Sequence, residues 1–259
     1  MPILERIFIY PIKSLDGLAL SSATVVYGGA LQHDREFALV DAEHRFVNAK
    51  RFPAIHHIRA TFELEQEVVI LSAPRVGTQR FHLRHEPARL QEYFSDYFGF
   101  RVFLVHDAQR GFPDDQDASG ATVVAHASLQ QVAQWFAGLS TEELMRRFRV
   151  NLILGEADAF WEDRLYGADG ESVRFQIGSV MFEGIKPCAR CVVPTRDALS
   201  GDVYPGFQKI FSERRRQTLP MWAEPSHFTH FYRLSVNTKA AMSEVGKVLR
   251  LGDAVKMVF

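Results

Sequence analysis

The sequence predicts a mainly β, α+β fold, in which a β-barrel-like core carries peripheral helices and follows an N-terminal β-rich subdomain. Two observations lead to this prediction. Apolar residues alternate with polar ones over many short segments, which is the pattern of half-buried strands. Long helical segments are few, so a doubly wound α/β sheet is disfavoured. With 259 residues, of which 47% are hydrophobic and 24% charged, the chain can bury a substantial core.

The N-terminal part, residues 3–105, reads mainly as strands. Period-two alternation marks the first strand at residues 3–10 and a later one at residues 58–64. Residues 37–47 predict a hairpin that turns at the polar stretch Asp41–Arg45. One helix is expected from Pro87, where proline suits the first turn, to Gly99, which suits a helix end.

A polar stretch from Asp107 to Gly120 separates two subdomains, which we place at residues 1–106 and 107–259. The second begins with a short strand at Thr122–Ala125 and a helix capped by Ser128. Further expected elements are a helix near residues 142–147, a strand at 150–154, a hairpin of 173–177 with 180–185, and a closing strand pair around Gly252-Asp253.

Charge and termini narrow the classes of function. Thirty basic and thirty-one acidic residues give a net charge of -1, which provides no overall field for nucleic acid or a membrane surface. The one basic run, Arg214–Arg216, is expected to be a solvated helix face. The N-terminus has no basic stretch followed by a long apolar one, so a cytoplasmic location without a membrane anchor is expected.

The two cysteines, Cys188 and Cys191, form a C-x-x-C pair at the end of a predicted strand. In a reducing compartment this spacing favours metal or redox chemistry over a structural disulfide. A thiolate is the ligand form of cysteine, and the flanking cations Lys186, Arg190 and Arg196 would lower a cysteine pKa if they face the sulfur.

Several interpretations of this pair remain open from the residues alone. A thioredoxin-like site is disfavoured, because the pair does not open a helix in a βαβ unit. A zinc site could recruit His227 and His230, although 35 residues separate Cys191 from His227. The other two possibilities are a pair of ordinary thiols and a soft thiolate bound to a redox metal.

Five short segments, spread over both predicted subdomains, share the order and spacing of a known family. They are Tyr10-Pro-Ile-Lys-Ser, Asp34-Arg-Glu-Phe-Ala-Leu-Val, Asp117-Ala-Ser, Phe148-Arg-Val-Asn and Pro187-Cys-Ala-Arg-Cys, the last followed by Asp197 and Gly201. Together they resemble the MOSC domain family, in particular the group of the mitochondrial amidoxime reducing component and its bacterial relatives. The resemblance implies an N-terminal MOSC β-rich subdomain and a MOSC domain.

The resemblance implies a molybdenum cofactor whose metal is bound by Cys191, the second cysteine of the pair. A pterin phosphate needs cationic partners, and the residues that match the family's cofactor contacts are Lys13, Ser14, Arg35, Asp117, Ser119, Arg149, Asn151 and Arg190. Taken singly, lysines and arginines are usually solvated. Asn151 differs, because an amide in an apolar strand is costly to bury without partners.

The implied activity is the reduction of N-hydroxylated small molecules by removal of an oxygen atom. The sequence has no further cysteines for an iron-sulfur cluster, so a separate iron-sulfur or flavin protein is the expected electron donor. Two alternatives are a carrier of the cofactor or of sulfur without turnover, and a zinc-stapled binding module.

Overall fold

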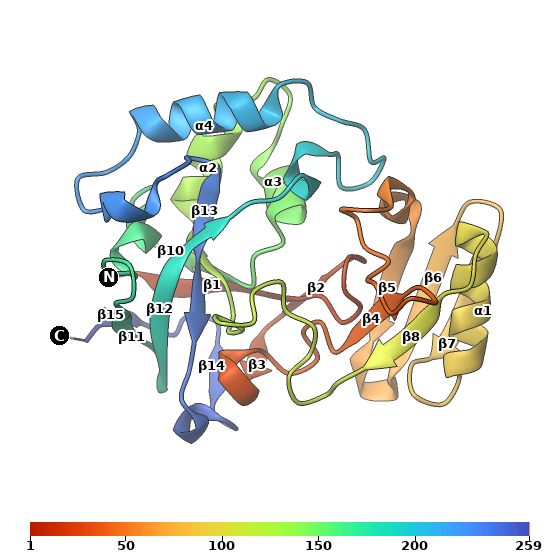
Figure 1. Cartoon of the computed structure of the whole chain (residues 1–259). Coiled ribbons are helices and arrows are strands. Elements are labelled where there is room, and N and C mark those ends of the chain that lie inside the picture. Colours follow the sequence, from red (N-terminus) through yellow and green to blue (C-terminus); the bar gives the residue numbers. More distant parts are fainter. Residues whose placement is uncertain (259) are drawn as a thin grey trace.

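The computed structural model describes residues 1–258, and its largest element is an eight-stranded sheet (Figure 1). Neighbouring strands are antiparallel, except that β9 and β10 run parallel. The mainly β, α+β prediction is confirmed. The strand order is β15 (Val255–Met257), β11 (Val173–Ile177), β12 (Val180–Ala189), β13 (Arg233–Lys239), β9 (Val123–Ala125), β10 (Leu152–Gly155), β1 (Ile3–Ile9) and β2 (Leu18–Leu20).

The N-terminal half adds a second unit, on the right of Figure 1. It contains a three-stranded sheet of β5 (Arg59–Glu63), β6 (Val68–Ala73) and β7 (Gly77–His82), and a ribbon of β4 (Phe37–Val40) with β8 (Phe103–His106). Helix α1 (Pro87–Phe98) ends at Gly99 with φ 75°, as expected. Buried residues between Ile12 and Val102 form the core of this unit.

The first strand links the two units, because β1 pairs with β10 of the large sheet. The large sheet therefore contains strands from both sides of residue 107, and the subdomain boundary placed there stays a prediction. The predicted turn at Asp41–Arg45 is confirmed, since the Asp41 carboxylate accepts hydrogen bonds from the backbone N–H of Glu43 and Arg45.

Three helices cover one face of the large sheet, along the top of Figure 1: α2 (His126–Ala133), α3 (Thr141–Phe148) and α4 (Phe207–Gln217). Apolar residues of these helices and of the segment after α2 form a core with β10 and β13, in which Phe136 and Phe207 stack with ring centroids 4.3 Å apart. At the start of α3, the Ser140 hydroxyl accepts a hydrogen bond from Glu143 N–H. The apolar residues of the other sheet face form a separate core.

The closing strand pair predicted around Gly252-Asp253 is wrong. Two strands do flank this turn, but β14 (Val248–Arg250) pairs with β3 (Ser22–Thr24), whereas β15 pairs with β11. The turn is also bonded to β1, because the backbone N–H of Gly252 donates to the Leu4 carbonyl. The period-two pattern identified the strands correctly but carried no information about their partners.

Two further expectations need correction at one buried polar cluster. Ser128 does not cap α2, whose cap residue is Ala125; instead its hydroxyl donates to Glu162 Oε2 at 2.7 Å. In the basic run of α4, Arg214 and Arg216 are exposed, but Arg215 is buried and pairs with Asp163. The guanidinium of Arg215 also lies 4.1 Å from the Phe160 ring centroid. Arg215 therefore lies on the buried face of α4, where its charge compensates the buried Asp163 carboxylate.

Glu162 is expected to make stability depend on pH. Burial, together with the Asp163 carboxylate, raises the pKa of Glu162 from 4.5 to about 7. The folded state therefore binds this proton more tightly than the unfolded chain, so the stabilisation is complete below pH 4.5 and is lost as the pH rises through 7. Its full size is about 3 kcal/mol.

Glu162→Gln should flatten this pH dependence, because the glutamine Oε1 can still accept from Ser128 and from Ala125 N–H. Urea unfolding at several pH values from 4.5 to 8 measures it. The exposed Glu43→Gln variant serves as the control. Equal pH profiles for wild type and Glu162→Gln would contradict the assignment.

Candidate functional site

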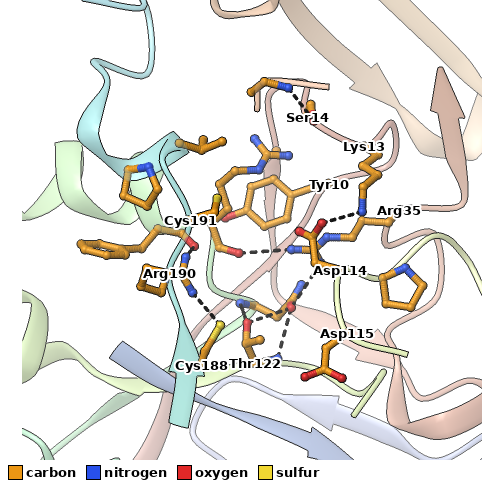
Figure 2. Close-up of a pocket in the computed structure, with 18 of the residues that line it drawn as sticks. Tyr10, Lys13, Ser14, Arg35, Asp114, Asp115, Thr122, Cys188, Arg190 and Cys191 are labelled. Atoms are coloured by element: carbon orange, nitrogen blue, oxygen red, sulfur yellow. Dashed lines mark hydrogen bonds and ion pairs between the residues drawn. The ribbon is translucent and has the colours of Figure 1, made fainter. Parts of the chain in front are cut away.

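A cavity of about 960 Å³ lies where the N-terminal unit meets the large sheet. Its wall is formed by the segment after β1, the loop before β9, the end of α3 and the segment that follows β12. Figure 2 shows Tyr10 in this wall, with the cysteine segment on one side and Lys13 and Arg35 on the other. All nine residues that the sequence assigned to the site line this one cavity: Lys13, Ser14, Arg35, Asp117, Ser119, Arg149, Asn151, Arg190 and Cys191.

The cavity wall is strongly cationic. Twelve lysine and arginine residues line it, against six aspartate and glutamate residues, although the whole chain carries a net charge of -1. Cations gathered in a concave, partly desolvated wall attract an anionic ligand. The charge distribution therefore favours a ligand with one or more anionic groups.

Two arginines contact the buried ring of Tyr10. The guanidinium carbon of Arg149 lies 4.1 Å from the ring centroid, and that of Arg35 lies 5.2 Å from it. Burial raises the pKa of Tyr10 to about 12, against the effect of both arginines, so the ring stays neutral. Tyr10 therefore brings two like charges together without neutralising them.

The two arginines differ in how they are compensated. Arg35 pairs with Asp34, which raises the pKa of Arg35 in spite of burial. Arg149 has no such partner: burial and Arg35 lower its pKa, and one guanidinium nitrogen, Nη1, donates to the Leu15 carbonyl at 2.6 Å. Its Nη2 is buried and has no hydrogen-bond partner within residues 1–258. An unpaired donor of this kind is costly unless a ligand accepts from it.

Three of the predicted residues lie in left-handed backbone: Ser14 at φ 74°, Arg35 at φ 51° and Arg149 at φ 52°. This conformation is uncommon for residues other than glycine. For Arg149 it also ends α3, because its N–H donates to the Met145 carbonyl where the helix stops. Residues held in unfavourable backbone often lie at functional sites, since the side chain is needed there.

Lys13 is 6% exposed, and its ammonium group donates to the Phe112 carbonyl at 2.8 Å and to Asp114 at 2.9 Å. Burial lowers the pKa of Lys13, against the effect of Asp114. Lys13 and Arg35 hold the pKa of Asp114 well below its ordinary range, although burial opposes them. The Asp114 carboxylate therefore partly compensates the charges of Lys13 and Arg35.

The loop before β9 contains Asp117 and Ser119. The Asp117 side chain is exposed, and the backbone N–H of Asp117 donates to the Asp115 carboxylate. Asp115 also pairs with Lys186 at 2.9 Å, so it fixes this loop against the end of β12. Ser119 packs against Gly28, whose φ is 70°. Asp117 and Ser119 therefore border the cavity from a loop that the Asp115 carboxylate holds in place.

Asn151 is 1% exposed, and its amide is fully engaged inside the protein. Its Oδ1 accepts from Thr122 N–H at 3.2 Å and from the Thr122 hydroxyl at 3.1 Å, and its Nδ2 donates to the Phe8 carbonyl at 3.1 Å. The amide therefore joins β1 to the start of β9. The burial of Asn151 was expected to indicate a ligand, but these internal bonds explain the burial by themselves.

Replacing Asn151 with leucine should lower the free energy of unfolding by roughly 3 kcal/mol, because buried polar groups of Phe8 and Thr122 lose their partners. Chemical unfolding of the protein without cofactor measures the loss, and the exposed Gln109→Leu variant is the control. A loss below about 1 kcal/mol would show that the amide does not brace the strands.

Cys188 lies near the end of β12, and Cys191 follows in the next turn; both are half-buried and line the cavity. Of the three flanking cations, Arg190 contacts a sulfur, and it is that of Cys188, with Nη1 3.2 Å from Sγ. Lys186 pairs with Asp115, and Arg196 donates to the Gly201 carbonyl. The condition that the flanking cations face a cysteine sulfur is therefore met by Arg190 alone, and at Cys188.

Arg190 is held by two groups of Phe148. Its Nη2 donates to the Phe148 carbonyl, and its guanidinium lies over the Phe148 ring at 5.0 Å. Its Nε is buried without a partner in the described chain.

The histidines of the zinc alternative do not join the cysteines. His227 Nε2 bonds to the Gly167 carbonyl at 2.9 Å, and the ring packs edge-on against Tyr166. Among residues 1–258, the one cluster of three metal-ligating side chains is Glu67, His82 and His85, in the N-terminal unit. A four-ligand zinc site at the cysteine pair is therefore not formed.

Several cavity residues had no sequence signal of their own. Tyr10 and Asp34 occur inside the recognised segments, but only the structure shows the ring and the carboxylate placing the arginines. His56 comes from a segment with no recognisable pattern, and Arg59 lies in a predicted strand whose alternation gave no sign of a site. Their position on the wall depends on how the N-terminal unit packs against the segment after Cys191.

Within residues 1–258, none of the helices has the length and apolar character that crossing a membrane requires.

Comparison with known proteins gives two overlapping family matches. Residues 1–142 match the MOSC N-terminal beta barrel domain, and residues 114–256 match the MOSC domain. Curated relatives include proteins named molybdenum cofactor sulfurase from Caenorhabditis briggsae and Oryza sativa subsp. japonica, both 22% identical. These alignments cover 88% and 77% of this chain, but 34% and 29% of the relatives, so the chain spans about a third of their length.

Among solved structures, the YUAD protein from Bacillus subtilis aligns with 99% of this chain and 96% of its own, at 11% identity and a TM-score of 0.40.

Proposed function

Because the chain belongs to the MOSC domain family, we propose that it binds a molybdenum cofactor and reduces N-hydroxylated small molecules by removing an oxygen atom. A function related to the molybdenum cofactor is supported by the family matches and by the names of the curated relatives. The reductive chemistry is our proposal. It rests on one observation: a half-buried cysteine and an excess of cations share one cavity.

The residues present fit a phosphorylated pterin that carries a soft metal. A thiolate is the kind of ligand that such a metal selects, and Cys191 would supply it. The phosphate would be held by Lys13, Arg35 and Arg149, where the unpartnered Nη2 of Arg149 offers a donor. Ser14, Asp117, Ser119 and Arg190 would complete the contacts to the pterin, and Asn151 would support this wall through its bonds to Phe8 and Thr122.

When bound, the molybdenum centre supplies two-electron chemistry that takes up an oxygen atom. For an amidoxime the balance is two electrons and two protons consumed, with the N–O bond broken and the amidine and water released. The protein would orient the substrate and limit access of water. A separate iron-sulfur or flavin protein would deliver the electrons.

Turnover is tested with the molybdenum-loaded protein, benzamidoxime as substrate and reduced viologen as the electron donor. We expect formation of benzamidine in proportion to the molybdenum content, because only the loaded protein contains the redox centre. Chromatographic quantification of benzamidine measures it, with metal-free protein as the control. If the fully loaded protein forms no benzamidine, the reductase proposal fails.

The two cysteines should differ in molybdenum retention. Cys191→Ser should lower the molybdenum content after purification by at least roughly tenfold, the smallest loss typical of residues that merely orient a metal ligand. Cys188→Ser should retain the metal, since Cys188 contacts Arg190. Elemental analysis and pterin fluorescence measure both variants. Loss in Cys188→Ser with retention in Cys191→Ser would reverse the assignment.

A second candidate function is transport of the cofactor or of sulfur without turnover. The names of the curated relatives favour it, and so does the Cys188 sulfur, which lies on the same cavity beside a guanidinium. This function predicts bound pterin or a protein persulfide together with no reduction of benzamidoxime. The same turnover experiment therefore separates the two.

A further inference from the structure

A buried histidine with an unpartnered nitrogen lines the cavity. His56 lies in the short 3-10 helix Pro53–His57 of the N-terminal unit and is 9% exposed. Its Nε2 has no hydrogen-bond partner within residues 1–258. The next residue, His57, is exposed and does not line the cavity. A buried polar atom beside a cavity, with no protein partner, is best explained by a ligand that bonds to it.

Three arginines line the same cavity as this histidine. Burial lowers the pKa of His56, and Arg149, Arg196 and Arg59 lower it further, against a backbone hydrogen bond to Ala198. Arg196 Nε and Arg149 Nη2 are also buried without partners in the described chain. Arg59 is compensated, because it pairs with Asp16 at 3.1 Å. Two guanidinium groups therefore present N–H donors that no carboxylate of the chain accepts, and the His56 ring presents a nitrogen that donates once the imidazole is protonated.

The turn that follows Cys191 fixes these groups in place. Gly201, at φ 75°, packs so closely that a Cβ there would lie 3.3 Å from the Cβ of His56. Arg196 donates to the Gly201 carbonyl at 3.1 Å, and Arg59 donates to the Ala198 carbonyl at 3.4 Å. The Asp197 carboxylate holds the turn by accepting from the N–H groups of Leu199 and Ser200. The donors are therefore preorganised between the cysteine segment and the N-terminal unit.

We propose that His56 and Arg196, beside the Arg149 that faces the cofactor phosphate, form a subsite for a carboxylate group of the substrate. The inference rests on the proposed reductase function and predicts that acidic N-hydroxylated compounds are preferred over neutral ones such as benzamidoxime. A carboxylate accepts several hydrogen bonds at once and matches the planar guanidinium. It would also favour the protonated imidazole, which then donates from Nε2. Lys13 and Arg35, which face Asp114, remain available for the pterin phosphate together with Arg149.

Binding of benzoate to the molybdenum-loaded protein tests this subsite without any turnover. Histidine ring resonances are followed by NMR in protein labelled at its histidines, and the His56 signal is assigned with His56→Gln. We expect benzoate to shift this signal saturably, whereas benzamide, of the same shape but neutral, does not. His56→Gln and Arg196→Met should each weaken benzoate binding by about tenfold, measured by calorimetry. His57→Gln is the matched control and should bind as the wild type does.

Three results would overturn the proposal: no saturable shift with benzoate, equal shifts with benzoate and benzamide, or wild-type affinity in both Arg196→Met and His56→Gln. A parallel titration of metal- and pterin-free protein with inorganic phosphate tests whether the anion that binds at His56 is instead the phosphate of the cofactor. If phosphate shifts the His56 signal there and the loaded protein no longer binds benzoate, the subsite belongs to the cofactor and the proposal is wrong. Failure of the reductase proposal appears separately, as loaded protein that binds benzoate but forms no benzamidine.

Discussion

The site depends on one electrostatic constraint, which is that positive charge is buried around Tyr10 without full compensation by the protein. Arg35 has Asp34, but Arg149 relies on a carbonyl oxygen and on the face of the Tyr10 ring. Left-handed backbone at both arginines and an aromatic ring between them keep this arrangement in place. A fold selected for stability alone would place a carboxylate there or avoid the charge. The retained charge is what makes the cavity a receptor for anions.

The same imbalance extends along the wall toward His56, where the partners are again incomplete. The cavity thus has two cationic regions, and Arg149 lies between them. One region faces Asp114 through Lys13 and Arg35, and the other lies beside the turn after Cys191. Two separate regions suit a small anionic substrate next to a phosphorylated cofactor better than they suit a single anion.

Much of this could be predicted from the sequence, for identifiable reasons. Period-two alternation located β1 and β5, and proline and glycine located both ends of α1, because these signals act over a few residues. Recognised segments identified residues that meet in one cavity, although they lie as far apart as Lys13 and Cys191.

The partners of β14 and β15 could not be predicted, since a strand pattern does not specify its neighbour. Arg215 looked solvated because its buried carboxylate partner is distant in sequence. His56 offered no signal, since its meaning arises from the arginines that packing brings around it.

The Asn151 brace has a consequence for the order of events during synthesis. It joins Phe8 to a residue 143 positions later, and β1 finds its partner β10 only after that distance. Contacts so distant in sequence form late, and a chain emerging from the ribosome must expose more than half of its length before they can form. The cationic wall is therefore incomplete in the nascent protein. A large charged cofactor would bind only after β1 and β10 have paired and both units have folded.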